Sequence, residues 1–200
     1  MKAFRWERLG GFGASTVNFP RRTLFEPSGE NRNEGQTIPT GATTMSNETA
    51  KGEEMATQRA IDEADIRRRI DKLADAISTM DLEIVMSFYA RDMVSFDIVP
   101  PLRNVGVEAK RRQWVEAFAT YRPPLGYEFR NLAITVGDDV AFAHSLNRMS
   151  GTLKNGRQMD FWLRWTACFR KADGSWLIAH DHVSVPVDHA NGKALLDLEP

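Results

Sequence analysis

Hydrophobic residues after position 56 first recur every three or four positions, which is the period of an α-helix. We expect this first helix to begin near Thr57 or Asp62. Asp81 then fits the N-cap of a second, shorter helix over 82–90. The stripe that defines the first helix consists of Ile66, Ile70, Leu73, Ile77 and Met80. Its opposite face carries charged residues, so one side of the helix should be buried and the other exposed.

An extended segment over 93–99 follows, and then a third helix is predicted over 107–120. This helix projects Trp114 and Phe118 from one side, because residues four positions apart lie on the same face. The chain up to this point is therefore predominantly helical.

After Pro124 the pattern changes to alternation, which is typical of β-strands. Compact turn signals divide this region into four strands, near 127–136, 140–152, 158–171 and 175–186. Three helices followed by an antiparallel meander predict an α+β fold, in which a strongly curved antiparallel sheet wraps around the helices as a cone. Such a cone is closed at one end and offers a pocket at the other. The turn signals are Gly137-Asp138-Asp139, Asn155-Gly156 and Asp173-Gly174.

Alternation also predicts which strand residues face the helices. Odd positions of the 158–171 strand are apolar, and the odd set of the last strand is apolar except for Asp181. Asp181 is therefore predicted to be an inward-facing carboxylate, and Asn147 is placed inward on its own strand. A β-bulge between Trp176 and His182 would invert the assignment for the last strand.

The sequence predicts one folded domain with two extensions. Residues 1–56 lack sustained periodicity and are rich in small and polar residues, so we expect a disordered extension there. The domain should cover 57–188, with a C-terminal tail over 189–200. The basic N-terminal segment could also be an organellar transit peptide, or translation could begin at Met45 or Met55.

Charge and cysteine content narrow the range of partners. With 26 basic and 27 acidic residues, the chain shows no footprint for nucleic acid or an anionic membrane, and Lys110-Arg111-Arg112 is interpreted as a solvated helix face. No apolar run reaches the roughly 20 residues that span a bilayer. A single cysteine, Cys168, cannot form an internal disulfide, which favours a reducing compartment, and we expect a cytoplasmic protein.

Two groups of short motifs resemble known families. Tyr89-Ala90-x-Asp92-x-x-x-x-Asp97, followed by Gly106, is similar to the helix-to-strand segment of ketosteroid isomerases. Asp173-Gly174-x-Trp176 and His180-x-His182-x-Ser184 resemble SnoaL-like proteins and the association domain of calcium/calmodulin-dependent kinases. Over about residues 60–188 the chain thus resembles the nuclear transport factor 2-like superfamily, which implies the same cone fold.

The isomerase resemblance implies a role for Asp97. Asp97 matches the carboxylate that removes a proton next to a carbonyl group. The two oxyanion donors of that family are not matched, because Leu73 and Ala167 occupy their positions. Steroid isomerisation itself is therefore not expected, since the donors supply the largest electrostatic contribution to that mechanism.

Asp97 and Asp181 are the candidate catalytic pair, with one carboxylate ionised and the other kept protonated by burial. In the alternative, Asp97 caps a turn and Asp181 pairs with Arg130 or Arg103. Trp114, Phe118, Asn147 and Trp165 are the candidate pocket for a small hydrophobic molecule, although core packing explains the aromatic residues equally well.

The outer face of the last two strands is predicted to form a homodimer interface. No cofactor is expected, because the chain has no glycine-rich phosphate loop, and no metal, because the histidines lack further ligands. Two functions stay open: a cofactor-free isomerase, lyase or cyclase that uses Asp97, and a non-catalytic ligand-binding or dimerisation module. The interface residues are Arg164, Thr166, His180, His182 and Ser184.

Overall fold

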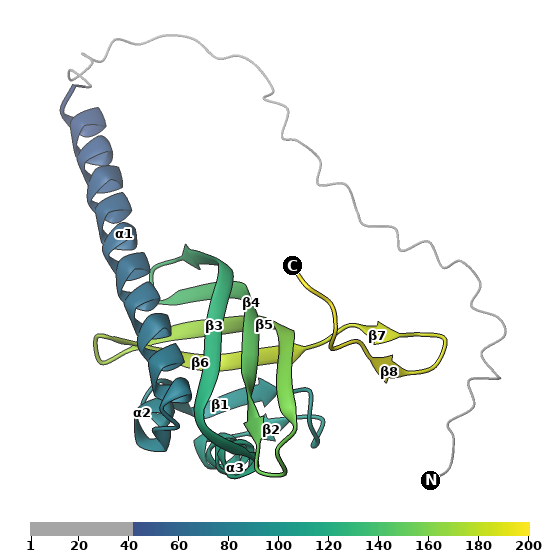
Figure 1. Cartoon of the computed structure of the whole chain (residues 1–200). Helices are drawn as coiled ribbons and strands as arrows, with labels where there is room; N and C mark the ends of the chain where they lie inside the picture. The colour runs from purple at the N-terminus through teal and green to yellow at the C-terminus, as the bar shows by residue number, and fades with distance from the viewer. Residues whose placement is uncertain (1–41) are drawn as a thin grey trace, which may run out of the picture. The chain divides into compact units, whose positions relative to one another are not determined.

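The computed structural model describes residues 42–200, and side chains from Ala50 onward (Figure 1). Helices precede a long meander, as the sequence predicts, so the α+β class is confirmed. The helices are α1 (Ala42–Ser78), α2 (Leu82–Met86) and α3 (Val107–Thr120). The strands are β1 (Tyr89–Phe96), β2 (Asn104–Val105), β3 (Tyr121–Val136), β4 (Val140–Leu153), β5 (Gln158–Ala172), β6 (Ser175–Ser184), β7 (Val187–Asp188) and β8 (Lys193–Ala194).

Six strands form one sheet in the order β2-β1-β6-β5-β4-β3. All neighbouring pairs are antiparallel except β1 and β6, which are parallel. The sheet is therefore mixed, whereas the sequence predicted an antiparallel one. The difference arises because β1 precedes the meander and joins its last strand rather than its first, so no hairpin sets the direction of this pair.

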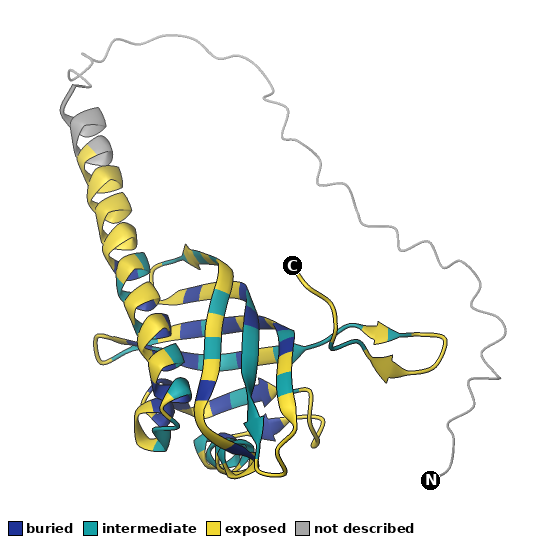
Figure 2. Cartoon of the chain, viewed as in Figure 1, coloured by how far each residue is buried: buried dark blue, intermediate teal, exposed yellow. Residues whose placement is uncertain are grey.

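Helix α1 begins at Ala42, well before the expected start near Thr57. Residues 42–56, which were predicted to be disordered, are helical, while residues 1–41 of that extension lie outside the described part of the chain. Side chains from Ala50 to Ile61 are exposed, and burial begins at Asp62 (Figure 2). No helix in the described part of the chain has an apolar stretch long enough to cross a membrane.

The predicted stripe of α1 forms one side of the hydrophobic core. Ile66, Ile70, Leu73 and Ile77 are each at most 3% exposed, and Met80 packs beside them. Their partners on the sheet are the odd residues of β5, including Trp165 and Phe169, so the predicted facing of that strand is confirmed. Burial of such side chains is the main source of stability, at about 1.5–3 kcal/mol each.

The segment between α2 and β1 differs from the prediction. Asp81 does cap α2, since its side chain accepts a hydrogen bond from the Ile84 amide at 3.1 Å. The helix nevertheless ends at Met86, and Tyr89 starts strand β1 instead of lying in a helix. The predicted extended segment over 93–99 is thus a strand that begins earlier, and this change directs Tyr89 into the protein interior.

Strand β6 contains a β-bulge at Ala179. Cys168 pairs with His180 and Phe169 pairs with Ile178, so Ala179 has no partner on β5. Before the bulge the even residues Trp176 and Ile178 are buried, and the inward assignment of Leu177 and Ala179 is therefore wrong. After the bulge the odd positions face inward, so Asp181 is buried, as predicted.

The segment expected to be a simple tail contains a short hairpin. Strand β7 pairs with β8 through Val187 with Ala194 and Asp188 with Lys193. The hairpin crosses the predicted boundary between residues 188 and 189, because its turn is closed by hydrogen bonds that the Asp188 carboxylate accepts from Ala190 N and Asn191 Nδ2.

Candidate functional site

A buried cluster of three charged side chains lies where α3 faces the ends of β1 and β6. The Lys110 Nζ atom is 3.0 Å from Asp181 Oδ2 and 3.5 Å from Asp97 Oδ2, and it donates to Ser95 Oγ at 3.1 Å. The side chains of Lys110 and Asp181 are 3% and 2% exposed, and that of Asp97 is 14% exposed. The structure therefore brings the two predicted carboxylates together, with an ammonium group between them.

The burial of Lys110 contradicts its interpretation as part of a solvated helix face. The residue lies four positions before Trp114 on the inward side of α3, and only its neighbours Arg111 and Arg112 point outward. Arg111 forms an exposed ion pair with Glu83. The signal that could have identified Lys110 is its helical spacing to Trp114 and Phe118.

Lys110 stays positively charged in this environment. Burial alone lowers the pKa of its ammonium group, but the carboxylates of Asp181 and Asp97 outweigh this effect and raise the pKa above its usual value. A buried charge is tolerated only when it is paired and hydrogen-bonded. The ion-pair partner of Asp181 is Lys110 and not one of the predicted alternatives, Arg130 and Arg103. Arg130 is paired with Glu128 instead.

Tyr89 joins this cluster from the start of β1. Its hydroxyl group accepts a hydrogen bond from Trp114 Nε1 at 3.3 Å and donates one to Asp181 Oδ2 at 3.5 Å. Burial, and secondarily the Asp181 carboxylate, raise the pKa of Tyr89 well above its usual value, so the phenol remains protonated. Asp181 Oδ2 is thus held by both Lys110 and Tyr89.

A second series of hydrogen-bonded side chains ends at Tyr127 on β3. Ser145 Oγ donates to Asn147 Oδ1 at 2.5 Å, and Asn147 Nδ2 donates to the Tyr127 hydroxyl oxygen at 3.0 Å. Burial raises the pKa of Tyr127 to about 12. Because its oxygen accepts from Asn147 and its proton has no acceptor among the described residues, the Tyr127 hydroxyl group is available as a donor. Asn147 therefore acts through Tyr127.

Tyr89, Asp97, Lys110, Tyr127 and Asp181 line a small cavity of about 70 Å³. An open groove of about 460 Å³ lies beside it and shares Asp97, Ile98, Lys110 and Trp114 with the cavity. Asp97 is the shared carboxylate, so it stands where the two spaces meet. The cavity is also lined by Leu73, Ile77, Phe129, Leu163, Trp165 and Val183.

The predicted pocket residues have different positions relative to this cavity. Trp114 and Trp165 line it, whereas Phe118 packs on Trp114 with ring centroids 5.3 Å apart and lines neither space. Leu73, at the position of the missing tyrosine donor, lines the cavity as well. Ala167, at the position of the missing acidic donor, pairs directly with Asp181 across β5 and β6. The carboxylate of Asp181 on β6 thus lies next to the position on β5 where the isomerase resemblance places an acidic donor.

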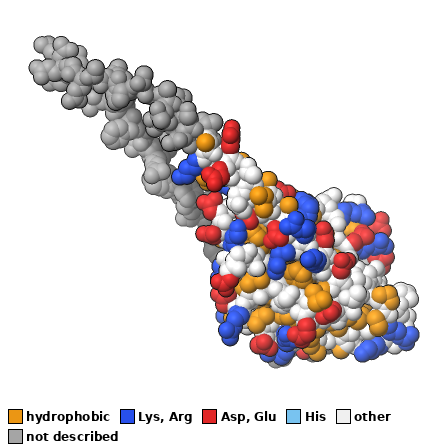
Figure 3. Space-filling view, turned by 90° about the vertical axis from the view of Figure 1, so that its left-hand side faces the viewer, with side chains coloured by type: hydrophobic (Ala, Val, Ile, Leu, Met, Phe, Trp, Pro, Cys, Tyr) orange, Lys and Arg blue, Asp and Glu red, His pale blue; other side chains and the backbone are white. Residues whose placement is uncertain are grey.

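The predicted dimer-face residues are adjacent on the outer side of the sheet. Arg164 pairs with Ser184 and Thr166 with His182, and His180 Nδ1 is hydrogen-bonded to the Val94 carbonyl oxygen at 2.9 Å. No group of three potential metal ligands occurs within residues 42–200. Over the face that Figure 3 shows, basic and acidic side chains are interspersed, without an extended patch of one sign.

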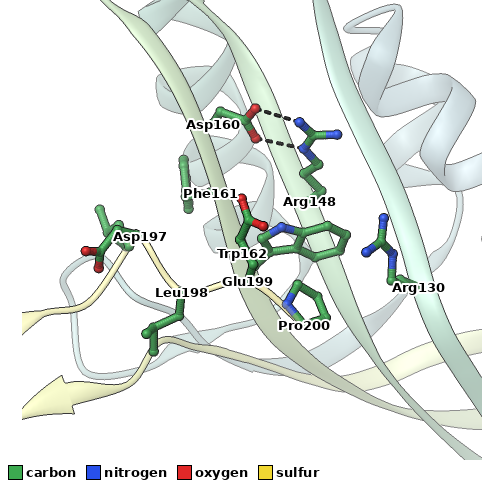
Figure 4. Close-up of a pocket in the computed structure, with 10 residues that line it drawn as sticks. Arg130, Arg148, Asp160, Phe161, Trp162, Asp197, Leu198, Glu199 and Pro200 are labelled. Atoms are coloured by element: carbon green, nitrogen blue, oxygen red, sulfur yellow. Dashed lines mark hydrogen bonds and ion pairs between the residues drawn. The ribbon is translucent and has the colours of Figure 1, made fainter.

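A second space of about 460 Å³ lies between the outer side of the sheet and the C-terminal segment, and Figure 4 shows it. Three of its charged side chains already have partners: Arg148 binds both oxygens of Asp160 at 2.7 and 2.8 Å, and Arg130 stacks over Trp162 at 4.4 Å. No unpaired buried polar group faces this space within the described residues. The cluster at Lys110 is therefore the stronger candidate site.

Comparison with known proteins identifies the family and confirms the fold. Residues 66–188 match the model of the SnoaL-like domain, and the chain belongs to this family. An NTF2-like protein of unknown function from Pseudomonas putida is 30% identical, with a TM-score of 0.65, over 70% of this chain and 98% of that one. The fold is therefore of the nuclear transport factor 2-like type.

Two more distant structures share the fold. A scytalone dehydratase-like protein from Novosphingobium aromaticivorans is 12% identical, with a TM-score of 0.62, over 73% of this chain and 100% of that one. A ketosteroid isomerase-like protein from Erwinia carotovora is 24% identical, with a TM-score of 0.53, over 60% and 93%. No curated protein gives a significant match.

Proposed function

We propose that this protein is an acid/base enzyme, an isomerase or lyase, that acts on a small and largely apolar carbonyl compound with Asp97 as general base. The observation that carries the proposal is the position of Asp97 where the small cavity meets the open groove, beside the buried ammonium group of Lys110. A carboxylate there can reach a ligand that enters through the groove. Names of an isomerase and a dehydratase among the structural neighbours are consistent with such chemistry.

The chemistry follows from the donors and acceptors around the cavity. The Asp97 carboxylate removes a proton from the carbon next to the carbonyl group, and the electron pair of that C–H bond moves onto the carbonyl oxygen. The Tyr127 hydroxyl group donates a hydrogen bond to the resulting enolate oxygen and stabilises it. The positive charge of Lys110 stabilises the enolate further. The enolate then takes the proton back at another carbon, as in an isomerase, or expels a leaving group, as in a lyase.

The sizes of the two spaces define the ligand. A cavity of about 70 Å³ holds only a polar head group, whereas the groove of about 460 Å³ accommodates a larger apolar body. Ile98, Val99, Pro100 and Met149 give the groove its apolar character. We expect a compound with one carbonyl head group and one hydrophobic ring or chain.

The alternative is a ligand-binding or dimerisation module without catalysis. It is favoured by the ion pair between Lys110 and Asp181, which is a stable arrangement without any ligand. In that case the cavity binds a molecule without proton transfer, and the outer face of β5 and β6 carries the physiological contact.

The experiment compares two isosteric variants. Carbonyl compounds that raise the melting temperature are first selected by thermal shift, and incorporation of solvent deuterium at the α-carbon is then followed by NMR. Asp97→Asn should abolish this exchange while it leaves ligand affinity largely unchanged, because only the proton acceptor is lost. Asp92→Asn is the matched control, since Asp92 lies on β1, the strand that ends directly before Asp97, but is exposed and paired with Arg170.

Equal exchange in the wild type and in Asp97→Asn would remove the catalytic role of Asp97. Absence of exchange in the wild type, with ligands that demonstrably bind, would remove the proposed enzymatic function and leave the binding module.

A further inference from the structure

Ser145 and Asn147 are two buried polar side chains on β4. They are two positions apart, so both point to the same, inward side of the sheet, and they are 6% and 1% exposed. Their surroundings are apolar, since Asn147 pairs with Phe129 on β3 and with Leu163 on β5. An unpaired polar atom is costly in such a place, so each of these atoms should use the few partners within its reach.

The amide group of Asn147 has two orientations, which have opposite effects on Tyr127. With the amide nitrogen toward Tyr127, Asn147 donates to the hydroxyl oxygen, and the Tyr127 proton stays free. With the amide oxygen toward Tyr127, that oxygen accepts the proton, and none remains for a ligand. The orientation of one amide group thus decides whether Tyr127 offers a hydrogen-bond donor to the cavity.

The distances support the first orientation. Ser145 Oγ lies 2.5 Å from Asn147 Oδ1, which is within the range of O–H···O bonds and too short for an N–H···O bond. Asn147 Nδ2 lies 3.0 Å from the Tyr127 oxygen, which is typical of an N–H···O bond. The Ser145 hydroxyl group therefore holds the amide group in the orientation that leaves the Tyr127 proton free.

We infer that Ser145 is a positioning residue, which fixes the amide group of Asn147 so that the Tyr127 hydroxyl group donates to the carbonyl oxygen of the ligand. The inference rests on the proposed function, because it takes a carbonyl compound as the ligand. Tyr127 lines the small cavity together with Asp97 and Lys110. Burial raises the pKa of Tyr127 to about 12, and the hydrogen bond from Asn147 opposes this rise. The phenol thus stays protonated and is a better donor than it would be without Asn147.

The test measures the hydrogen bond to the ligand directly. The probe is acetophenone with an isotopic label at its carbonyl carbon, and its infrared carbonyl band moves to lower wavenumber when the oxygen accepts a hydrogen bond. The band should be shifted on binding to the wild type, and Tyr127→Phe should abolish this shift. Ser145→Ala should weaken it, because the released amide group can turn and accept the Tyr127 proton. Deuterium exchange of the probe should also slow by about 2–10-fold in Ser145→Ala, as expected for the loss of one hydrogen bond.

A double variant separates this role from a merely structural one. In Ser145→Ala combined with Asn147→Leu the competing acceptor is gone, so the band should return toward its wild-type position. A packing defect at Ser145 would not be repaired by a second substitution. Asn147→Leu alone should also keep the shift, and it decides the test if the double variant does not fold. Ser150→Ala is the matched control, since Ser150 lies on the same strand with its side chain on the other side of the sheet.

An unchanged carbonyl band in Ser145→Ala would overturn the inference, and so would a shift that the double variant fails to restore. Absence of any shift in the wild type at millimolar probe would overturn it as well, because Tyr127 would then not donate to a carbonyl ligand. Asp97→Asn should abolish exchange and leave the band unchanged. A shift that depends on Ser145, in a wild type without exchange, would therefore support the inference and refute the proposed function. Exchange that depends on Asp97, with a band that Ser145→Ala does not change, would give the opposite result.

Discussion

Replacing Lys110 by methionine tests the buried cluster most directly. Methionine has a similar length and fits an apolar site, so the change removes the charge and little else. It leaves Asp181, with a side chain 2% exposed, without its ammonium partner at 3.0 Å. Removal of one member of a buried pair costs about 3–5 kcal/mol, because the other charge stays buried and unpaired. A domain with a stability of about 5–15 kcal/mol would lose a large fraction of it.

The pH dependence of the free energy of unfolding provides a second, independent test of this prediction. The pKa of Lys110 is raised in the folded protein, so its stabilising contribution is present at all pH values below its usual pKa. It is lost only as the pH rises through the folded-state pKa, far above neutrality. In Lys110→Met this contribution is absent at every pH. The difference from the wild type should therefore be equally large at pH 6 and pH 8.

Urea unfolding, followed by tryptophan fluorescence at both pH values, measures this difference. The midpoint should fall while the slope stays constant, because the area exposed on unfolding is unchanged. Arg111→Met, at the next position of α3, is the matched control and should have little effect, since its ion pair with Glu83 is exposed. Lys110→Met combined with Asp181→Leu should recover part of the loss. If the single variant unfolds at the wild-type midpoint at both pH values, the buried ion pair is refuted.

Two other predictions concern the ligand and the outer face. Tyr127→Phe removes the free donor and should lower kcat by about 10²–10³-fold in the deuterium exchange assay. An unchanged exchange rate would show that Tyr127 is not the donor. Arg164→Glu combined with His182→Glu places like charges on the predicted dimer face and should give monomers in analytical ultracentrifugation. Here an unchanged dimer mass, or a wild type that is already monomeric, would count against that face.

The sequence was sufficient to locate the three helices and the four-stranded meander, although not the ends of every helix. The stripe from Ile66 to Ile77 and the alternation in β5 each follow one period without interruption, and both faces were predicted correctly. The parallel pairing of β1 with β6 was not predictable, because it joins strands that are far apart in the sequence. The start of α1 was misplaced because residues 50–61 are exposed on all sides and carry no periodic signal.

Of the candidate site, only the two carboxylates were predicted from the sequence. Asp97 came from a motif and Asp181 from strand alternation, and both line the cavity. Lys110 was missed because it lies in a run of three basic residues, which was interpreted as a solvent-exposed helix face. Tyr89 was assigned to a helix. Tyr127 was not identified as a candidate, because its side chain is neutral. Hydrogen bonds such as that between Asn147 and Tyr127 depend on the alignment of neighbouring strands, which a single sequence does not specify.

The bulge at Ala179 divides β6 into two parts with different roles. Trp176 and Ile178, before it, belong to the general core, whereas Asp181 and Val183, after it, line the cavity. Substitutions of Trp176 or Ile178 should therefore change stability alone, whereas a substitution of Val183 should change which ligand is accepted. Asp181 contributes to both, because it lines the cavity and pairs with Lys110. In this protein, Val183 is accordingly the position of β6 to alter when the pocket is to be redesigned.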